Sequence, residues 1–322
     1  MSVLAPAGVF ALPLPTRFRG LRVRHGMLLR GPAGWAEWSP FDEYTRPEID
    51  SWWQAAREAA VEGFPAPLRT SVPVNVTIPA TDPESAHRMV TRSGCRTAKV
   101  KVAERGQYLA EDVARVEAVR DALGPDGKLR IDANGAWSVP DALSRLRALE
   151  QFDLEYAEQP CASTEDLARL RKELARRGID IPIAADESIR RSGDPERVAR
   201  LEAADVAVLK VQPLGGVRRC LELAETLGLP VVVSSALESS VGLRAGVALA
   251  ACLPELQYAC GLNTAALFSG DVTSEPLVAQ GGALEVREVT VDDDAAWRAD
   301  RETEGWWRER WASLPAELRS LE

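Results

Sequence analysis

The strongest constraint on the fold is a set of short apolar segments that recur at regular intervals from residue 74 onward. Their starts lie 23 to 31 residues apart, which is the span of one strand, one helix and two loops. The eight segments are 74–80, 97–102, 128–134, 154–160, 181–188, 206–213, 230–238 and 256–263. The stretches between them are amphipathic. One of these, residues 163–178, begins with Ser163 and Thr164 as capping residues and ends on Gly178, as helices do.

Strands that alternate with helices predict a parallel sheet. Eight units over about 210 residues favour a closed (β/α)8 barrel, the α/β fold known as the TIM barrel. The alternative is an open, doubly wound sheet, in which a Gly-x-Gly-x-x-Gly turn commonly follows the first strand. The even spacing of the units, and the lack of that turn after residues 74–80, favour the barrel.

The two ends of the chain predict a second, smaller unit. Residues 21–41 have the pattern of a hairpin and residues 46–63 that of a helix. Eight of the nine tryptophans lie in the end segments, and leaving those of the tail exposed would be costly: Trp35, Trp38, Trp52, Trp53, Trp297, Trp306, Trp307 and Trp311. We therefore expect residues 1–73 and 286–322 to pack together as an α+β capping domain on a barrel of residues 74–285. The alternative is a tail that stays a loose, solvated helix.

Charge and cysteine content limit the classes of partner. A net charge of −9 disfavours nucleic acids and anionic membrane surfaces, which select basic faces. No run approaches the ~18 apolar residues of a membrane span. The apolar start of the chain lacks a basic segment and is broken by prolines, so we expect no signal peptide. Five cysteines without metal-site or disulfide-framework spacing fit reduced thiols in a cytoplasmic protein, and two histidines are too few for a histidine-rich metal site.

Ionisable residues end the middle strands of the predicted barrel, at the edge where barrel enzymes carry their active sites. In strand order they are Lys99 and Lys101, Asp132, Glu158, Asp186, and Lys210, with Asn134 two residues after Asp132. Each one alone has an ordinary explanation, because a strand-end aspartate commonly caps the next helix and a strand lysine commonly lies on a solvated edge. Their shared position at one end of five consecutive strands indicates an active site.

Three adjacent strands place the carboxylates of Asp132, Glu158 and Asp186 on one arc of the barrel mouth. Carboxylates that converge without a cation repel one another. A hard divalent ion resolves this repulsion, and a ligand set made only of oxygens favours magnesium or manganese over zinc. We therefore expect a magnesium site that manganese can also fill.

Lys101 and Lys210 lie four strands apart and would face each other across the mouth of an eight-stranded barrel. A lysine with the ordinary pKa of ~10.4 is a poor base at neutral pH, and lowering that value to about 7 requires ~4–5 kcal/mol. A nearby metal cation and the ammonium of Lys99 would both disfavour the charged form of Lys101 and so lower its pKa. The arrangement indicates proton abstraction from a carbon acid whose carboxylate is held on a metal, with an enediolate intermediate.

Five motifs, in this order and spacing, resemble the muconate-lactonising branch of the enolase superfamily. They are KVK (99–101), IDANGAW (131–137), EYAEQP (155–160), AADES (184–188) and LKVQPLGG (209–216). The resemblance implies magnesium ligands at Asp132, Glu158 and Asp186, with Lys101 and Lys210 as the acid–base pair. It further implies that Lys99 tunes Lys101, with Asn134 beside it, and that the chain ends form the capping domain of that superfamily.

Four more segments resemble the o-succinylbenzoate synthase family within that branch: 18–41, 72–81, 234–242 and 260–272. That family dehydrates 2-succinyl-6-hydroxy-2,4-cyclohexadiene-1-carboxylate in menaquinone biosynthesis. The resemblance implies that Lys101 removes the α-proton and then protonates the departing hydroxyl on the same face, while Lys210 stays charged. The chain departs from the family pattern in two ways: its first domain is short, and His25 stands in place of an expected glutamate. Both departures bear on the loop near residues 16–20, which in that family would set substrate specificity.

The loops after the seventh and eighth predicted strands carry small residues and hydroxyl groups. Ser239, Ser240 and Gly261 are therefore candidates for binding the distal carboxylate of the substrate. Ordinary turn chemistry is the alternative explanation of these residues.

Two other functions compete with dehydration. N-acylamino-acid racemases and dipeptide epimerases use the same opposed lysines, but dipeptide epimerases typically carry Asp-x-Asp near the eighth strand, where this chain has only Asp271. A barrel that had become a binding protein would be expected to lack one of the five key residues, and all five are present. We expect an enzyme that acts on a small carboxylate, and a monomer is compatible with the sequence.

Overall fold

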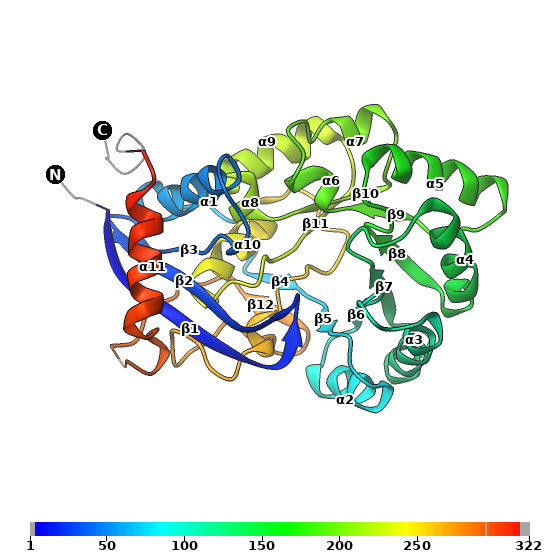
Figure 1. The fold of residues 1–322 in the computed structure, drawn as a ribbon, viewed down its shortest axis with the longest axis horizontal. Helices are drawn as coiled ribbons and strands as arrows, with labels where there is room; N and C mark the ends of the chain where they lie inside the picture. The colour runs from blue at the N-terminus through cyan, green and yellow to red at the C-terminus, as the bar shows by residue number, and fades with distance from the viewer. Residues whose placement is uncertain (1–3, 294, 316–322) are drawn as a thin grey trace.

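A seven-stranded parallel sheet forms the centre of the molecule (Figure 1), in a computed structural model that describes residues 4–293 and 295–315. Each strand is followed in the sheet by its successor in the chain, as a barrel requires. The strands are β5 (Val76–Ile78), β6 (Thr97–Lys101), β7 (Lys128–Asp132), β8 (Leu154–Glu158), β9 (Ile183–Ala185), β10 (Val206–Leu209) and β11 (Val231–Val233).

Two residues close this sheet between its first and last strands. The N–H of Cys260 donates to the carbonyl of Pro73, just before β5, at 2.7 Å. The N–H of Gly261 donates to the carbonyl of Val233 in β11, at 2.8 Å. The predicted barrel is therefore confirmed, and the open doubly wound sheet is wrong.

The eighth predicted strand, residues 256–263, is wrong in its length, because only residues 260–261 make bridges to their neighbours. A Cβ at Gly261 would lie 2.6 Å from the hydroxyl oxygen of Ser234, so the backbones meet here more closely than a larger residue permits. The chain then turns at Thr264 into the short helix η3 (Ala265–Leu267), which ends the strand.

Helices cover the outside of the barrel, and their sequences explain where they begin. In α5 (Thr164–Arg176) the Ser163 hydroxyl accepts a hydrogen bond from the N–H of Asp166 at 3.1 Å, and three leucines at helical spacing face inward: Leu167, Leu170 and Leu174. The other long helices are α2 (Pro83–Ser93), α3 (Leu109–Leu123), α4 (Val139–Leu149), α9 (Val217–Leu227) and α10 (Ser240–Cys252). Short helices are η2 (Glu150–Phe152), α6 (Glu187–Arg190), α7 (Arg197–Arg200) and α8 (Val211–Leu214).

An antiparallel sheet of three strands lies beside the barrel (Figure 1). It contains β1 (Ala5–Phe18), β2 (Leu21–Gly31) and β3 (Gly34–Trp38), so the predicted hairpin is confirmed. The prolines of β1 hid this long strand in the sequence. The structure accommodates them because β1 lies at the edge of the sheet, where some backbone N–H groups have no partner strand to bind.

The two ends of the chain pack on each other through tryptophans. Trp38 of β3 makes edge-to-face contacts with Trp53 of α1 (Glu48–Arg57) at 6.0 Å and with Trp307 of α11 (Arg301–Ala312) at 5.6 Å between ring centroids. All three rings are buried. The tail is therefore a packed helix and not a loose, solvated one (Figure 1).

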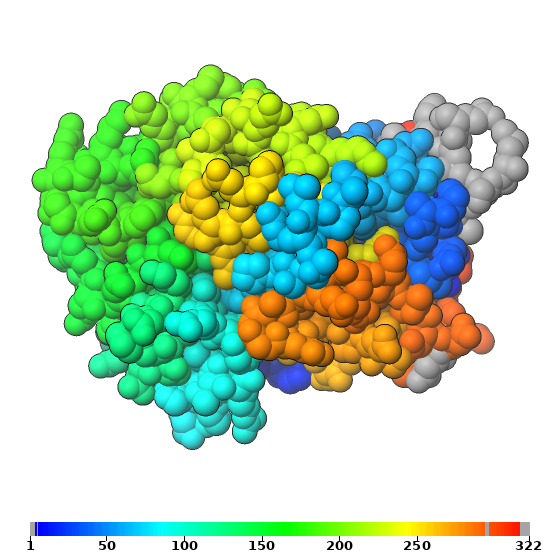
Figure 2. Space-filling view, turned by 180° about the vertical axis from the view of Figure 1, so that it is seen from behind, coloured from blue at the N-terminus to red at the C-terminus, as the bar shows by residue number. Residues whose placement is uncertain are grey.

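The connecting segments join the two units at several places. The helix η1 (Glu58–Glu62) continues α1, and η4 (Ala295–Trp297) precedes α11. Strand β4 (Ser71–Pro73) pairs with β12 (Ala283–Glu285), so the domain boundaries predicted at 73 and 285 meet in one small ladder. Seen from behind, the blue N-terminal segment lies against the orange segment that follows the barrel (Figure 2). Within the described residues, no helix has both the length and the apolar character needed to cross a membrane.

Replacing Trp307 tests the packing of the tail. Trp307→Ala should lower the free energy of unfolding by ~3–5 kcal/mol, because it leaves a large cavity among buried rings. Urea denaturation followed by circular dichroism measures the change. The matched control is Trp306→Ala, which removes a neighbouring ring that is 42% exposed and should cost about 1 kcal/mol or less. Equal losses in both variants would contradict the assignment of Trp307 to the core.

Candidate active site

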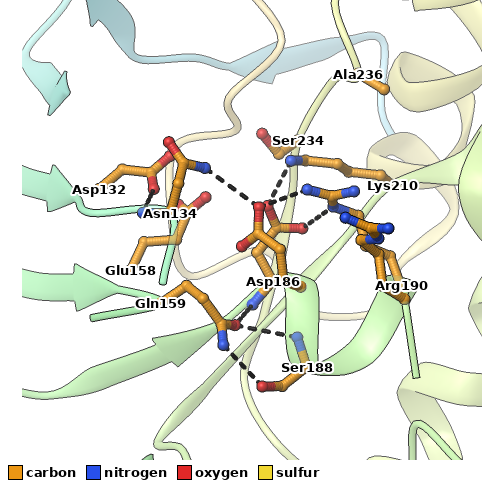
Figure 3. A network of polar contacts seen from close by, with 12 residues as sticks. Asp132, Asn134, Glu158, Gln159, Asp186, Ser188, Arg190, Lys210, Ser234 and Ala236 are labelled. Carbon is orange, nitrogen blue, oxygen red and sulfur yellow. Dashed lines mark hydrogen bonds and ion pairs between the residues drawn. The ribbon is translucent and has the colours of Figure 1, made fainter. Parts of the chain in front are cut away.

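Three carboxylates lie at the same end of three consecutive strands. In the parallel ladder Asp132 pairs with Glu158, and Glu158 pairs with Ala184, so that Asp186 lies just beyond the end of β9. All three side chains are buried. Figure 3 shows Asp186 between Asp132 and Glu158 on one side and Lys210 and Arg190 on the other. The predicted arc of carboxylates is thus present at the carboxyl ends of the strands.

Each carboxylate is paired with a cationic side chain. The Nζ of Lys99 lies 2.9 Å from both carboxylate oxygens of Glu158 and 3.3 Å from Oδ2 of Asp132. Lys101 donates to Asp132 and, at 2.7 Å, to Oδ1 of Asn134. These contacts bring Lys99, Lys101 and Asn134 together on the β6–β7 side of the barrel mouth.

The opposite side of the mouth has its own ion pairs. Lys210, directly after β10, donates to Oδ2 of Asp186 at 2.6 Å. Arg190 of α6 donates through Nε to Oδ1 of the same carboxylate at 2.8 Å. Strands β6 and β10 hold the second and sixth positions of the eight around the barrel, so Lys101 and Lys210 approach the mouth from opposite sides. No strand-end pattern pointed to Arg190, although its position four residues after Asp186 was a usable signal.

Burial and charge act against each other in this cluster. Burial, together with the neighbouring Asp132 carboxylate, raises the pKa of Glu158 to about 7. Burial alone would raise the pKa of Asp132 as well, but the ammonium groups of Lys101 and Lys99 hold it well below its usual range. For Lys99, burial would lower the pKa, and the carboxylates of Glu158 and Asp132 outweigh that effect and raise it. The buried carboxylates of this site therefore depend on neighbouring cations for the stability of their charged forms.

The donor set suits a hard cation in its chemistry. It consists of carboxylate oxygens only, as magnesium prefers, and the Lys99 ammonium already bridges Glu158 and Asp132. Within residues 4–293 and 295–315, no three His, Cys, Asp or Glu side chains come close enough to one another to hold an ion. The carboxylates bind lysine and arginine nitrogens instead. Magnesium ligation by Asp132, Glu158 and Asp186 therefore stays a prediction.

Gln159 connects two of these carboxylate-bearing strands, and it was not among the predicted site residues. Its Oε1 accepts hydrogen bonds from the N–H groups of Asp186 at 2.9 Å and Ser188 at 3.1 Å. Its Nε2 donates to the Ser188 hydroxyl at 2.7 Å (Figure 3). The same Nε2 donates to the carbonyl of Cys161 at 2.9 Å. The buried carboxamide thus fixes the backbone that carries Asp186. Only its position next to Glu158 in EYAEQP pointed to this role.

A pocket lies over the lysines at the mouth of the barrel. Five residues of the predicted site line it: Lys99, Lys101, Asn134, Lys210 and Gly261. Four consecutive residues after β11, 234–237, form one wall, and the sequence analysis did not single out Ser234 or Ser235 among them. The capping sheet contributes Phe18 and Arg19 from the turn that contains the predicted specificity loop, and Phe41 follows β3.

Ser239 and Ser240 do not line this pocket. The Ser239 hydroxyl donates to Glu37 at 2.5 Å, and the Ser240 hydroxyl donates to Asp271 at 2.6 Å. Both serines are buried at the start of α10. A direct contact of these hydroxyls with the substrate stays a prediction, and the structure gives them partners within the protein.

Comparisons with known proteins agree with this geometry. Residues 82–291 match the family model described as enolase C-terminal domain-like, and residues 9–60 match the one described as enolase N-terminal domain-like. A protein from Thermobifida fusca named o-succinylbenzoate synthase is 62% identical, over 90% of this chain and 93% of its own. The chain belongs to the o-succinylbenzoate synthase family of the enolase superfamily. Another protein of that name, from Mycolicibacterium smegmatis, is 51% identical over 96% of this chain and 94% of its own.

Solved structures outside the o-succinylbenzoate synthase family share the fold. Muconate cycloisomerase from Pseudomonas fluorescens superposes with a TM-score of 0.75 at 22% identity, over 93% of this chain and all of that chain. The L-Ala-D/L-Glu epimerase from Bacillus subtilis gives a TM-score of 0.74 at 22% identity, over 88% and 96% of the two chains. At this identity the similarity shows the architecture alone, and it confirms the muconate-lactonising resemblance at the level of the fold.

Gln159→Leu tests how far the carboxamide holds the site together. The leucine fills the space but leaves two buried N–H groups unpaired, so kcat should fall at least about tenfold and the free energy of unfolding by ~2–4 kcal/mol. Steady-state kinetics and urea denaturation measure the two effects. The control is Gln151→Leu, since Gln151 is exposed and its side chain donates to the nearby carbonyl of Ala148. Unchanged kcat in Gln159→Leu would show that the position of Asp186 does not depend on this amide.

Proposed function

We propose that the protein is an o-succinylbenzoate synthase that uses magnesium. It would dehydrate 2-succinyl-6-hydroxy-2,4-cyclohexadiene-1-carboxylate to 2-succinylbenzoate through an enediolate, in menaquinone biosynthesis. The observation that carries the proposal is a single pocket lined by Lys101 and Lys210, which come from opposite sides of the barrel above three buried carboxylates. Identity of 62% to a protein of that name supports the same reaction.

Lys101 acts as the base and then as the acid in this mechanism. Its neutral amine takes the proton from the α-carbon of the substrate, and the electron pair of the broken C–H bond enters the enediolate. The resulting ammonium gives that proton to the hydroxyl group on the same face, which leaves as water while the ring becomes aromatic. Asn134 accepts a hydrogen bond from Lys101, and Lys99 contacts the same Asp132 carboxylate that binds Lys101.

Lys210 contributes charge from the other face. Its ammonium is held by Asp186, whose pKa stays low despite burial because Arg190 and Lys210 stabilise the carboxylate. In this mechanism the Lys210 cation stabilises the developing enediolate and exchanges no proton with it. Asp132, Glu158 and Asp186 would hold the magnesium ion, which when bound supplies positive charge to the substrate carboxylate.

A cytoplasmic location fits the free thiols. All five cysteines are unpaired and buried, as expected of a protein in a reducing compartment. We propose a small carboxylate as the only partner that the reaction needs, with no role for nucleic acid or membrane lipid. Racemisation of N-acyl amino acids would need the same two lysines, but the relatives named o-succinylbenzoate synthase, at 62% and 51% identity, do not favour it.

Removal of divalent metal tests the role of the carboxylates. Exhaustive chelation should abolish turnover of the cyclohexadiene substrate, and added magnesium should restore it, with manganese as a second metal to compare. The rate at which 2-succinylbenzoate forms, followed by absorbance, measures the effect. Circular dichroism checks that the chelated protein stays folded. Full activity after chelation would mean that the carboxylates serve only in ion pairs.

Substitution of the two lysines separates dehydration from racemisation. Lys101→Ala should lose essentially all turnover, because both proton transfers depend on it. Lys210→Arg keeps a cation that does not deprotonate, so a dehydratase should retain part of its activity, limited by the fit of the larger group. Lys172→Ala, on the exposed surface of α5, is the control and should behave as wild type.

A racemase would behave differently in the same experiment. Each lysine would then exchange the α-proton of one enantiomer of an N-acyl amino acid with solvent deuterium. Lys210→Arg would be as inactive as Lys101→Ala in inverting these substrates. Exchange from both enantiomers in the wild type, lost for one enantiomer in each variant, would contradict dehydration as the sole activity.

A further inference from the structure

Two buried charged residues of the capping sheet have no part in the chemistry described above. Arg24 of β2 and Glu37 of β3 are each only 2% exposed. Burial, with the nearby Glu238 carboxylate, raises the pKa of Glu37 to about 7, and burial lowers the pKa of Arg24 to about 10. Burial thus disfavours the charged form of both side chains, and hydrogen bonds to Ser39 and to the barrel hold them in place.

Glu37 reaches from the capping sheet into the start of helix α10 in the barrel. Its Oε2 accepts hydrogen bonds from the N–H and hydroxyl of Ser239, at 3.0 and 2.5 Å, and from the N–H of Gly242 at 3.2 Å. Its Oε1 accepts from the Ser39 hydroxyl at 2.5 Å. A Cβ at Gly242 would lie 2.8 Å from the Glu37 carboxylate carbon, so glycine at this position allows the close approach.

Arg24 binds the same barrel segment through a backbone carbonyl. Its Nε donates to the carbonyl of Leu237 at 3.0 Å, and its Nη2 donates to the carbonyl of Ser39. Arg24 thus binds the carbonyl of Leu237, just before Glu238, and Glu37 binds the N–H of Ser239, just after it. Ser39 links them, because it bonds to both.

The segment held in this way is the pocket wall after β11. Residues 234–237 line the pocket, and α10 begins shortly after them, at Ser240. Leu237 has a φ of +65°, a conformation that costs free energy for a non-glycine residue and persists only where surrounding contacts impose it. Arg24 binds the carbonyl of Leu237 itself, and Glu37 binds the N–H of Ser239 two residues further on, so both contacts help to hold this conformation.

We propose that Glu37 and Arg24 are positioning residues, which hold residues 234–239 in the shape that binds the part of the substrate remote from the reacting carbon. The cap thereby sets substrate affinity through the barrel wall as well as through its own loop residues. This inference rests on the proposed function for the identity of the substrate. It does not require Glu37 or Arg24 to touch the substrate.

The chain contains a matched control for this role. Glu58 of η1 also comes from the N-terminal segment, is also buried, and caps a barrel helix by accepting from the N–H groups of Val217 at 2.5 Å and Arg218 at 3.1 Å. Its helix, α9, contributes no residue to the described lining of the pocket. Loss of Glu58 should therefore weaken the same interface without altering the pocket wall.

The test compares Glu37→Ala with Glu58→Ala. Glu37→Ala should raise KM for the cyclohexadiene, and Kd for the product 2-succinylbenzoate by calorimetry, about tenfold, with kcat changed less than about threefold. Glu58→Ala should leave KM and Kd within about twofold of wild type. Glu37→Gln should restore most of the affinity, because its amide oxygen can accept from Ser239 and Gly242 while its NH2 donates to Ser39. If Glu37→Ala fails to fold, Glu37→Asp replaces it, since it withdraws the carboxylate by one methylene and should raise KM likewise.

Equal KM and Kd values in the Glu37 and Glu58 variants would overturn the proposal. Failure of the proposed function would look different, since the wild type itself would then not dehydrate the cyclohexadiene. Hydrogen exchange followed by mass spectrometry gives a readout that needs no substrate. Exchange in residues 234–242 should rise in Glu37→Ala and stay at the wild-type level in Glu58→Ala, and an unchanged rate in Glu37→Ala would overturn the positioning role whatever the activity.

Discussion

The ion pairs between buried lysines and buried carboxylates at the mouth of the barrel are the interaction on which the rest of the site depends. Lys99 is enclosed with Glu158 and Asp132, and each of these groups would be costly to bury alone. Removing one member leaves an uncompensated charge in a place that excludes water. The geometry of the site is therefore maintained jointly, and the strands that carry these residues cannot shift independently.

The sequence was sufficient for the elements whose residue pattern is local. Alternation along residues 97–101 placed Lys99 and Lys101 on one face, and the regular spacing of the units placed Asp132, Glu158 and Asp186 on adjacent strands. Strand β1 was missed because its prolines argue against a strand until its edge position is known. The roles of Gln159, Arg190 and Glu37 depend on contacts between segments far apart in the chain, which no local pattern reveals.

Ser239 lies in the predicted loop, but its hydroxyl contacts another part of the protein instead of the pocket. Its motif pointed to the loop that follows β11, and that loop does form a wall of the pocket. The hydroxyl, however, turns away toward Glu37 of the capping sheet. A hydroxyl next to a helix start has two possible destinations, the ligand or a neighbouring acceptor, and only the packing of the two units determines which one it takes.

The two-residue bridge at Cys260 and Gly261 has a consequence for how the barrel assembles. Closure joins Pro73 to Cys260, so nearly the entire barrel sequence lies within the loop that this contact completes. Contacts of such large sequence separation form slowly, because the chain must lose much of its freedom before they are made. We therefore expect the bridge to form later in folding than the contacts between neighbouring strands of the sheet, whose sequence separations are much smaller.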